Sequence, residues 1–546
     1  MASESTPEPG SPAPPPGPGT RTDVEQALLA GRSQRELAEQ RLSPAEERFE
    51  SGRRTLGWFL APAAALVFYF LPLDMDPTQQ ALAAVLLGVI ALWICESVPI
   101  PIGGLIGVAA VVLLGIAPPD EVLAPFGSTT VFTFIGVFII AQAMLKHGVA
   151  RRMAFFILAL PGVGSSTLRI VLAFGVITCL VSSFISNTAT VAMLMPTALG
   201  ILTVIAGMMQ ERGQVRPDFD PTRLRVGAAL MLMLAYGASV GGLLTPIGSP
   251  PNLIGRALIE EATGERISML QWMAAALPIV LAMFLVLAVV VLLLNRPEVR
   301  RIEGVNEYIH QQRAEQGPMS RAERNTVIAF GITVVLWLAP AVAGLVLGTE
   351  APLYTLLDER LDEGIVAVIG ASLLFVLPVD WGQRRMTLDW SDAARIDWGT
   401  VLLFGTGIIF GALLSSTGLA ETIGEGAASG LGIGSVFAIT AFGVLLAILV
   451  SETTSNTSSA TVVVPIVIPL AAAAGVDPFV PALAATFAAS FGFMLPVSTP
   501  QNAIVYGSGC VALPRMIRTG IVFDVVGAVL IILLLPLMAA LVGLGG

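Results

Sequence analysis

The chain has 546 residues, of which 55% are hydrophobic and only 12% carry a charge. Many of its apolar runs approach the roughly 20 residues that an α-helix needs to cross a bilayer. The composition therefore excludes a soluble globular protein and predicts an all-α polytopic membrane protein. The net charge of −10 says little about binding partners, because in a membrane protein the charge of each loop is informative and the total is not.

The first 50 residues differ from the rest of the chain. They open with the proline-rich stretch STPEPGSPAPPPGPGT, which cannot build a hydrophobic core, and continue as charged sequence to about Glu50. Residues 1–50 are therefore predicted to form a disordered or amphipathic cytoplasmic region. No basic segment followed by an apolar one is present, so we expect no signal peptide.

The apolar runs predict about 11 transmembrane helices. These cover residues 57–73, 79–95, 100–117, 128–147, 226–255, 268–294, 324–348, 363–380, 398–418, 480–510 and 518–543. Two segments remain, 165–207 and 434–473, and each holds two apolar arms around a polar tip. The first arms are short for spanning helices, which favours two re-entrant hairpins with buried tips.

Both hairpin tips contain the triplet Ser-Asn-Thr, in VSSFISNTATVAMLMP (181–196) and in SETTSNTSSATVVVPIVIP (451–469). Two further pairs of segments are alike in the same order: 134–150 resembles 404–420, and TPIGSPPN (245–252) resembles LPVSTPQN (495–502). An odd number of predicted spans separates the hairpins, so they would enter from opposite sides of the membrane. This pattern is typical of the inverted repeats of secondary transporters.

The repeat divides the chain into two halves. The first half would cover residues 51–295, with four spans, the hairpin 165–207, the broken helix 226–255 and the span 268–294. A cytoplasmic linker, 296–323, would follow. The second half, 324–546, would repeat the order with spans in 324–418, the hairpin 434–473, the broken helix 480–510 and the last span 518–543.

The polar residues at membrane depth suggest an ion site. Prolines such as Pro246, Pro250 and Pro500 free backbone carbonyls in the broken helices. Together with the side chains of the two tips they offer an all-oxygen environment that suits Na⁺, and free helix N-termini suit an anion. A single Ser/Thr cluster in a membrane helix more often serves interhelical packing. Duplication at matched positions favours a binding site.

The motifs SNTAT, SNTSSATVVVPI, TPIGSPPN, ASFGFMLPVSTPQNAIVYGSG and WICESVPIPIGG resemble those of the divalent anion:sodium symporter family, from about residue 55 to the C-terminus. The resemblance implies a homodimer held by a scaffold domain. It also implies an elevator-like transport domain that contains both hairpins, the broken helices and the last span. Gln501 departs from the first half, where Pro251 stands, which leaves the rigidity of that turn open.

The resemblance also implies site residues. The first sodium site would comprise Ser182, Ser186, Asn187 and Gly248, and the second Ser451, Thr454, Asn456 and Ser498. The substrate carboxylates would contact Asn187, Thr188, Ser455, Asn456, Thr457, Thr499 and Pro500. The intramembrane acid Glu452 is expected to brace its hairpin, because Ser183 takes its place in the first half.

The sequence thus predicts a sodium-coupled symporter of C4-dicarboxylates such as succinate, malate and fumarate, in the cell membrane. A sodium-independent dicarboxylate exchanger and a sulfate or citrate transporter remain alternatives on the same fold. An enzyme is disfavoured because both histidines, His147 and His310, are peripheral, and a channel because two half-sites do not make a continuous pore. Lys146 and the arginines are expected in loops or near span ends, so sodium would have to neutralise a bound dianion.

Arginine asymmetry predicts the orientation. Most arginines fall on the side of the N-terminus, which is therefore expected to be cytoplasmic with the C-terminus outside, whereas the outer loops hold only Arg256, Arg266 and Arg360. In a chain without native cysteines, a cysteine replacing Arg223 or Arg384 should react with a membrane-impermeant thiol reagent only from the cytoplasmic face, and one replacing Arg360 only from outside. The reverse labelling would overturn both the orientation and the entry sides of the hairpins.

Overall fold

The computed structural model describes residues 44–216, 219–299, 304–348, 350–423, 426 and 435–544. Most of the predicted N-terminal region, 1–43, lies outside the described residues. The described part is an all-α polytopic membrane protein, with 10 helices long and apolar enough to cross a membrane. Its exception is a small antiparallel pair, β1 (Pro378–Asp380) and β2 (Arg385–Met386), in the region where the span 363–380 was predicted to end.

The larger helices follow the predicted order. In the first half they are α3 (Pro44–Phe70), α4 (Pro77–Cys95), α5 (Ile100–Leu113), α7 (Thr129–His147), α8 (Val149–Leu158), α9 (Thr167–Ser182), α10 (Asn187–Glu211), α11 (Arg225–Gly242), α12 (Pro250–Thr263) and α13 (Met269–Leu294). In the second half they are α14 (Val305–Glu315), α15 (Arg321–Leu347), α16 (Pro352–Arg360), α17 (Glu363–Val376), α19 (Trp398–Ser416), α21 (Val436–Thr453), α22 (Asn456–Ala473), α23 (Phe479–Ala488), α24 (Pro500–Gly507) and α25 (Leu513–Leu541).

Some boundaries differ from the prediction for a common reason. Helix α3 begins at Pro44 instead of near residue 57, and α8 and α14 occupy segments that were predicted as loop or linker. The start of α3 and α14 are rich in Arg, Glu and Gln, which are good helix formers but not apolar, and α8 is a short helix of ten residues with two arginines, so a search for long apolar runs overlooks all three. Three of the four hairpin arms, α10, α21 and α22, are also long enough to span a membrane, so length alone does not identify a hairpin.

The broken helices break where proline and glycine interrupt them. The predicted span 226–255 is two helices, α11 and α12, separated by a 3₁₀ turn at Pro246–Gly248. The predicted span 480–510 is α23 and α24 around the irregular segment 489–499. Pro250 and Pro500 each start the second helix of the pair, a position where the missing N–H costs nothing.

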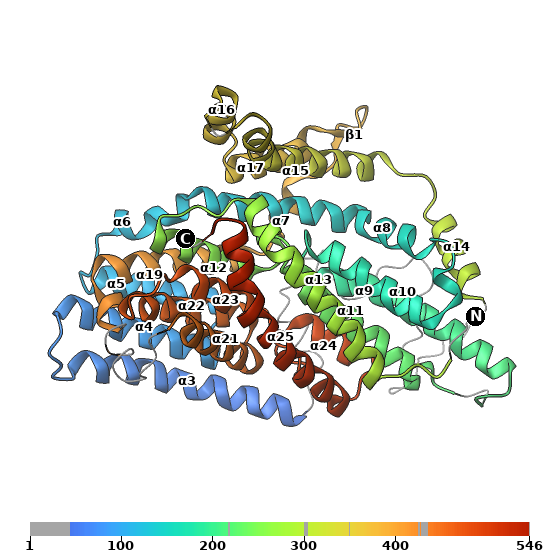
Figure 1. Cartoon of the computed structure of the whole chain (residues 1–546), viewed down its shortest axis with the longest axis horizontal. Coiled ribbons are helices and arrows are strands. Elements are labelled where there is room, and N and C mark those ends of the chain that lie inside the picture. The colour runs from blue at the N-terminus through green and yellow to red at the C-terminus, as the bar shows by residue number, and fades with distance from the viewer. Residues whose placement is uncertain are drawn as a thin grey trace, which may run out of the picture.

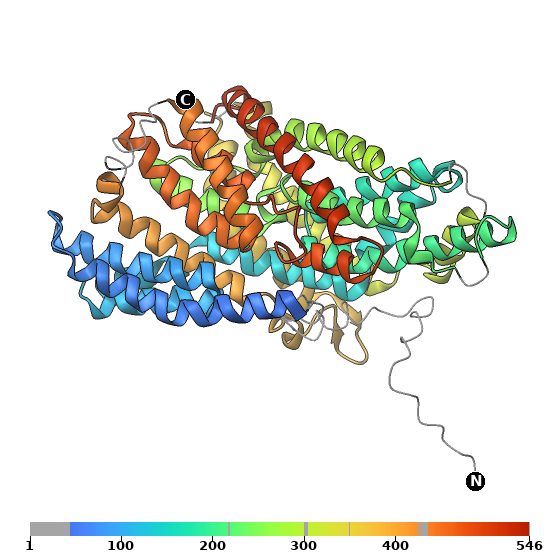
Figure 2. The ribbon, with the colours of Figure 1, turned by 90° about the horizontal axis from the view of Figure 1, so that it is seen from below.

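The two halves exchange partners in a reciprocal way. The first hairpin arms, α9 and α21, pack against the first parts of their own broken helices, α11 and α23. The second arms cross over, since α10 contacts α24 and α22 contacts α12. Helix α25 runs between the two hairpins in Figures 1 and 2 and contacts α13, α21 and α23. The hairpins and broken helices therefore form one interlocked unit.

Burial distinguishes central helices from peripheral ones. Within the apolar window of α11, 94% of residues are buried, whereas for α15 the share is 11%. Helices α15, α16 and α17 lie along the upper edge of Figure 1, and α7 beneath them contacts both α15 and α17. Helices α3, α4 and α5 lie together along another edge, clearest in Figure 2.

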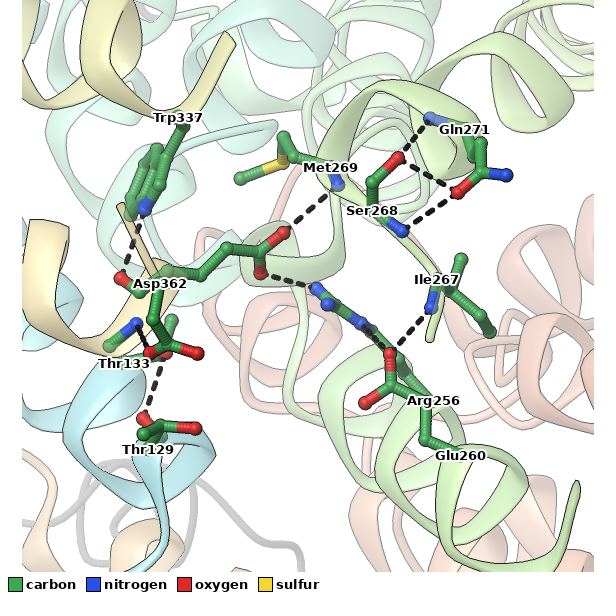
Figure 3. Close-up of polar contacts among 12 residues, drawn as sticks. Thr129, Thr133, Arg256, Glu260, Ile267, Ser268, Met269, Gln271, Trp337 and Asp362 are labelled. Atoms are coloured by element: carbon green, nitrogen blue, oxygen red, sulfur yellow. Dashed lines mark hydrogen bonds and ion pairs between the residues drawn. The ribbon is translucent and has the colours of Figure 1, made fainter. Parts of the chain in front are cut away.

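A buried ion-pair network joins the first broken helix to the second half. Arg256 of α12 donates from Nη1 to Glu363 Oε2 at 2.6 Å and from Nε to Glu260 Oε1 at 2.8 Å (Figure 3). Glu363 also accepts from the amide of Met269, at the start of α13. Arg256 is only 8% exposed, so its expected place in an outer loop is wrong. Its charge is tolerated because two carboxylates surround it.

Candidate functional site

The tip of the first hairpin forms one cluster of oxygen atoms, called the first oxygen cluster: Ser182, Asn187, Gly242 and Gly248. Ser182 ends α9 and Asn187 begins α10, and the Ser182 hydroxyl donates to Asn187 Oδ1 at 2.6 Å. Ser183 holds this tip to the broken helix, since its hydroxyl donates to the Gly241 carbonyl at 3.0 Å and its carbonyl accepts from the Thr245 hydroxyl.

The second oxygen cluster repeats this arrangement with Ser451, Asn456, Gly492 and Ser498. The Ser451 hydroxyl donates to Asn456 Oδ1 at 2.8 Å and to the Ala489 carbonyl at 3.0 Å. Asn456 Nδ2 donates to the Ser490 carbonyl at 3.3 Å. In both halves a serine five residues before the asparagine orients the amide oxygen, so the structure brings together the core of each predicted sodium site.

Glycine allows the tip and the break to approach in each half. A β-carbon on Gly248 would lie 2.5 Å from the Gly242 carbonyl oxygen and 3.0 Å from that of Ser183. A β-carbon on Gly242 would lie 2.7 Å from Asn187 Oδ1, and one on Gly492 would lie 3.1 Å from Asn456 Oδ1. The space beside each asparagine is thus bounded by oxygen atoms, the ligands that Na⁺ prefers.

Two asparagines without a predicted role bind the backbone carbonyls at the breaks of the broken helices. Asn252 Nδ2 donates to the carbonyls of Gly242 and Thr245, at 2.7 and 2.9 Å. Asn502 Nδ2 donates to the carbonyls of Gly492 and Leu495, at 2.7 and 3.1 Å. Each asparagine closes the repeated motif, PPN or PQN, and its matched position in both halves was the available signal.

Other predicted residues cap helix N-termini. The hydroxyls of Ser186, Ser455 and Thr499 accept the amide hydrogens of Ala189, Ser458 and Asn502, at 3.3, 3.2 and 3.3 Å. Pro500 is the first residue of α24. Helix starts carry N–H groups without intrahelical acceptors, so α10, α22 and α24 offer donors and a positive dipole end to an anion.

Not every predicted ligand joins its cluster through a hydrogen bond. The hydrogen bonds of Ser186 and Thr454 stay within their own hairpins, where Thr454 donates to the Val450 carbonyl at 2.7 Å. Thr188 is buried next to Asn187, whereas Ser455 and Thr457 are half-buried. The side-chain amide of Gln501 donates to the Ser239 hydroxyl at 3.0 Å. Although Gln501 stands where the first half has Pro251, α24 begins at Pro500 just as α12 begins at Pro250.

Glu452 braces the second hairpin as expected. Its Oε1 accepts from the amide of Met494 at 2.7 Å and its Oε2 from the Ser498 hydroxyl at 2.8 Å, which also donates to the Glu452 carbonyl at 3.1 Å. Ser183 fills the equivalent place in the first half. The brace fixes Ser498, so the acid supports the second oxygen cluster through its neighbour.

One cationic side chain comes closer to a tip than the sequence suggested. Arg53 of α3 donates to the Thr453 carbonyl at 3.2 Å, so the expectation that basic groups stay away from the triplets is wrong here. The guanidinium also lies 3.4 Å from Glu96 and donates to the Ile94 carbonyl at 3.2 Å. Because Glu96 balances its charge, Arg53 brings no net positive charge to the tip.

Comparison with known proteins identifies relatives of this chain. The family model described as "Sodium:sulfate symporter transmembrane region" matches residues 53–544. The sodium-dependent dicarboxylate transporter SdcS of Staphylococcus aureus is 30% identical over 498 residues, which cover 90% of this chain and 92% of SdcS. The solved structure of MtrF from Neisseria gonorrhoeae, from a class of antimetabolite efflux pumps, aligns with a TM-score of 0.52 at 14% identity over 88% of this chain and 94% of MtrF. That likeness concerns the fold alone.

The close approach at Gly248 generates a stability prediction. Gly248→Ala should lower the free energy of unfolding by about 1–3 kcal/mol, because the new methyl group meets backbone oxygens that cannot move aside. Gly407→Ala in α19 is the matched control, since a β-carbon there meets nothing within 4 Å. Thermal unfolding of the two purified variants in detergent measures the difference, and equal melting temperatures would contradict the packing described.

Proposed function

This chain belongs to the sodium:sulfate symporter family of divalent anion:sodium symporters, and we propose that it carries C4-dicarboxylates such as succinate, malate and fumarate into the cell together with Na⁺. The family is one of transporters, not enzymes, as the sequence motifs predicted. The name of SdcS, at 30% identity over most of both chains, supports sodium and a dicarboxylate as the pair carried.

The duplicated oxygen clusters carry the proposal. Ser182 with Asn187, and Ser451 with Asn456, present uncharged oxygens at the point where each backbone breaks. Ser182, Asn187 and Gly248 would hold one sodium ion, with Ser451, Asn456 and Ser498 holding another; Ser186 and Thr454 would add ligands. Each ion supplies positive charge next to a helix N-terminus, so a dianion is neutralised without a basic side chain.

The substrate would sit between the two tips. The starts of α10, α22 and α24 would provide amide and hydroxyl donors from Asn187, Thr188, Ser455, Asn456, Thr457 and Thr499, and Pro500 would contact the substrate without donating. Donors in two separate hairpins match a ligand with two separated carboxylates better than compact sulfate, which would occupy one tip well. The third carboxylate of citrate would lack a partner, so citrate would be carried as the dianion or carried poorly.

We propose an elevator mechanism, which the packing supports. We assign the hairpins, α11–α13 and α23–α25 to a transport domain and the helices within 57–147 and 324–418 to a scaffold. The reciprocal contacts of α10 with α24 and of α22 with α12 support this assignment, because they link the two clusters within one packed unit. We further propose a homodimer through the scaffold, with the N-terminus in the cytoplasm and the C-terminus outside.

Uptake of labelled succinate into proteoliposomes tests the proposal. A sodium gradient should drive accumulation, unlabelled malate and fumarate should compete well, and sulfate should compete poorly. Undiminished uptake in choline buffer would favour the sodium-independent exchanger instead. Displacement of succinate by sulfate far better than by malate would reassign the site to tetrahedral oxyanions.

The two triplet threonines should contribute to substrate binding alone. Thr188→Ala and Thr457→Ala should each weaken succinate binding by about 0.5–3 kcal/mol, the range that spans a lost hydrogen bond to a neutral group and one to a charged group. Thr203→Ala, an exposed position on the same helix as Thr188, is the matched control. The KM for succinate measures the loss, while stabilisation by sodium alone in a thermal melt should persist; an unchanged KM in both variants would remove these residues from the site.

A further inference from the structure

The ion pair between Arg256 and Glu363 joins the two domains of the proposed elevator. Arg256 belongs to α12, which we assigned to the transport domain, and Glu363 is the first residue of α17, in the scaffold. Arg256 Nη1 lies 2.6 Å from Glu363 Oε2, and Glu363 Oε1 accepts from the amide of Met269, at the start of α13, at 3.0 Å (Figure 3). Both of these contacts cross the boundary between the domains.

Glu363 is fixed within the scaffold. Its carbonyl accepts from Trp337 Nε1 of α15 at 3.0 Å, and the Asp362 carboxylate caps the amide of the following residue, Gly364, at 2.9 Å. A β-carbon on Gly364 would clash with the Thr129 carbonyl, so the backbones of α17 and α7 approach closely at this point. The carboxylate therefore stays with the scaffold if the domains move.

Arg256 is fixed on the other side of the boundary. A β-carbon on the preceding residue, Gly255, would clash with the Thr486 side chain of α23, and α12 also contacts α22. The same helix contacts α19 of the scaffold, so it lies at the boundary itself. Arg256 Nε donates to Glu260 Oε1 at 2.8 Å, one turn later in α12. The guanidinium and this second carboxylate therefore belong to the transport domain.

Each charge has a second source of stabilisation on its own side of the boundary. If the domains separate, Arg256 keeps Glu260. The Glu363 side chain is 23% exposed and stands in the first turn of α17, where water and the positive end of the helix dipole stabilise an anion. A pair that opens repeatedly requires such a fallback, because a buried charge without compensation is costly.

A second basic side chain at the boundary follows the same rule. Arg53 of α3, a scaffold helix, donates to the Thr453 carbonyl of the second hairpin at 3.2 Å. It lies 3.4 Å from Glu96, which belongs to its own domain. Movement of the hairpin would leave Arg53 with an acidic partner, as it would leave Arg256.

We propose that Arg256 and Glu363 form a latch, which holds the transport domain against the scaffold in the state of this structure and opens once in every transport cycle. This inference rests on the proposed elevator movement and names a contact that controls it. An elevator carries α12 past the scaffold, so a contact between α12 and α17 cannot persist in both end states. The latch therefore favours the state of this structure over the other end state.

The two acids around Arg256 should shift the balance between the end states in opposite directions. Glu363→Gln weakens a contact made in one state, so the ratio of that state to the other should fall about 10- to 100-fold, the range for one hydrogen bond to a charged group. Glu260→Gln removes the partner on which Arg256 depends once the latch is open, so it should raise this ratio. A purely structural pair would lower the melting temperature in both variants without opposite shifts.

Pulsed electron paramagnetic resonance in nanodiscs measures this ratio. Spin labels on Glu265→Cys, in the exposed loop after α12, and on Asp358→Cys, in α16, report the distance between the domains in a chain without native cysteines. Glu261→Gln and Glu359→Gln, at exposed positions of α12 and α16, are the matched controls and should leave the ratio unchanged. An unchanged ratio in Glu363→Gln, or shifts of both acid variants in the same direction, would overturn the latch.

Cross-linking tests whether the pair must open. In a chain with Arg256→Cys and Glu363→Cys, a short bifunctional thiol reagent that a reductant cleaves should abolish uptake of labelled succinate into proteoliposomes, and the reductant should restore it. Chains with one of the two cysteines, treated in the same way, should continue to transport. Undiminished uptake by the cross-linked protein would contradict the proposal.

The two measurements separate the latch from the proposed function. Uptake that is independent of sodium but still blocked by the cross-link would reject sodium coupling and support the latch. The resonance measurement requires no uptake, so it decides the matter if a cysteine variant does not transport. Folding of each variant is checked by its elution and thermal melt in detergent.

Discussion

Every irregular stretch of backbone at membrane depth must satisfy its polar groups within the protein, because lipid offers no hydrogen bonds. The two asparagines at the ends of the broken-helix motifs meet this requirement. Asn252 and Asn502 each tie down two carbonyls that the break has released, with the same spacing along the chain. Once these carbonyls are held, the break is rigid and the neighbouring hairpin tip can dock against it. The oxygen clusters are thus a consequence of how the broken backbone is satisfied.

The reciprocal packing of the halves extends this constraint to the whole site. A hairpin that docked only on its own broken helix would leave two independent half-sites. Because α10 contacts α24 and α22 contacts α12, each tip is positioned partly by the opposite half. A displacement of one cluster relative to the other would disturb both contacts. In the proposed function, this arrangement is what lets two distant segments of the chain bind one ligand.

The sequence predicts the motifs that repeat in both halves. It does not predict ion pairs and hydrogen bonds between elements that are far apart in the chain. The Ser-Asn-Thr triplets, the breaks at Pro246 and Pro500, and the family were all predictable, because each leaves a local pattern of polar and proline residues. The ion pair between Arg256 and Glu363 joins residues far apart in the chain, and no local pattern indicates it. The contact of Arg53 with the Thr453 carbonyl is equally remote in sequence. Helix α3 was predicted too short since hydropathy detects lipid-facing residues and not helix formers.

The second half has an acid, Glu452, where the first half has Ser183, and the lengths of the helices account for this difference. Helix α11 continues to Gly242, so the amides before the break bond within the helix. Helix α23 ends at Ala488, and the equivalent glycine, Gly492, already lies in irregular backbone. The amides that follow need an acceptor from elsewhere, and Glu452 supplies one to Met494. In the first half Ser183 faces a carbonyl and therefore acts as a donor. The shorter serine side chain would not reach both donors, so the shorter helix is accompanied by a carboxyl side chain beside one cluster and not the other.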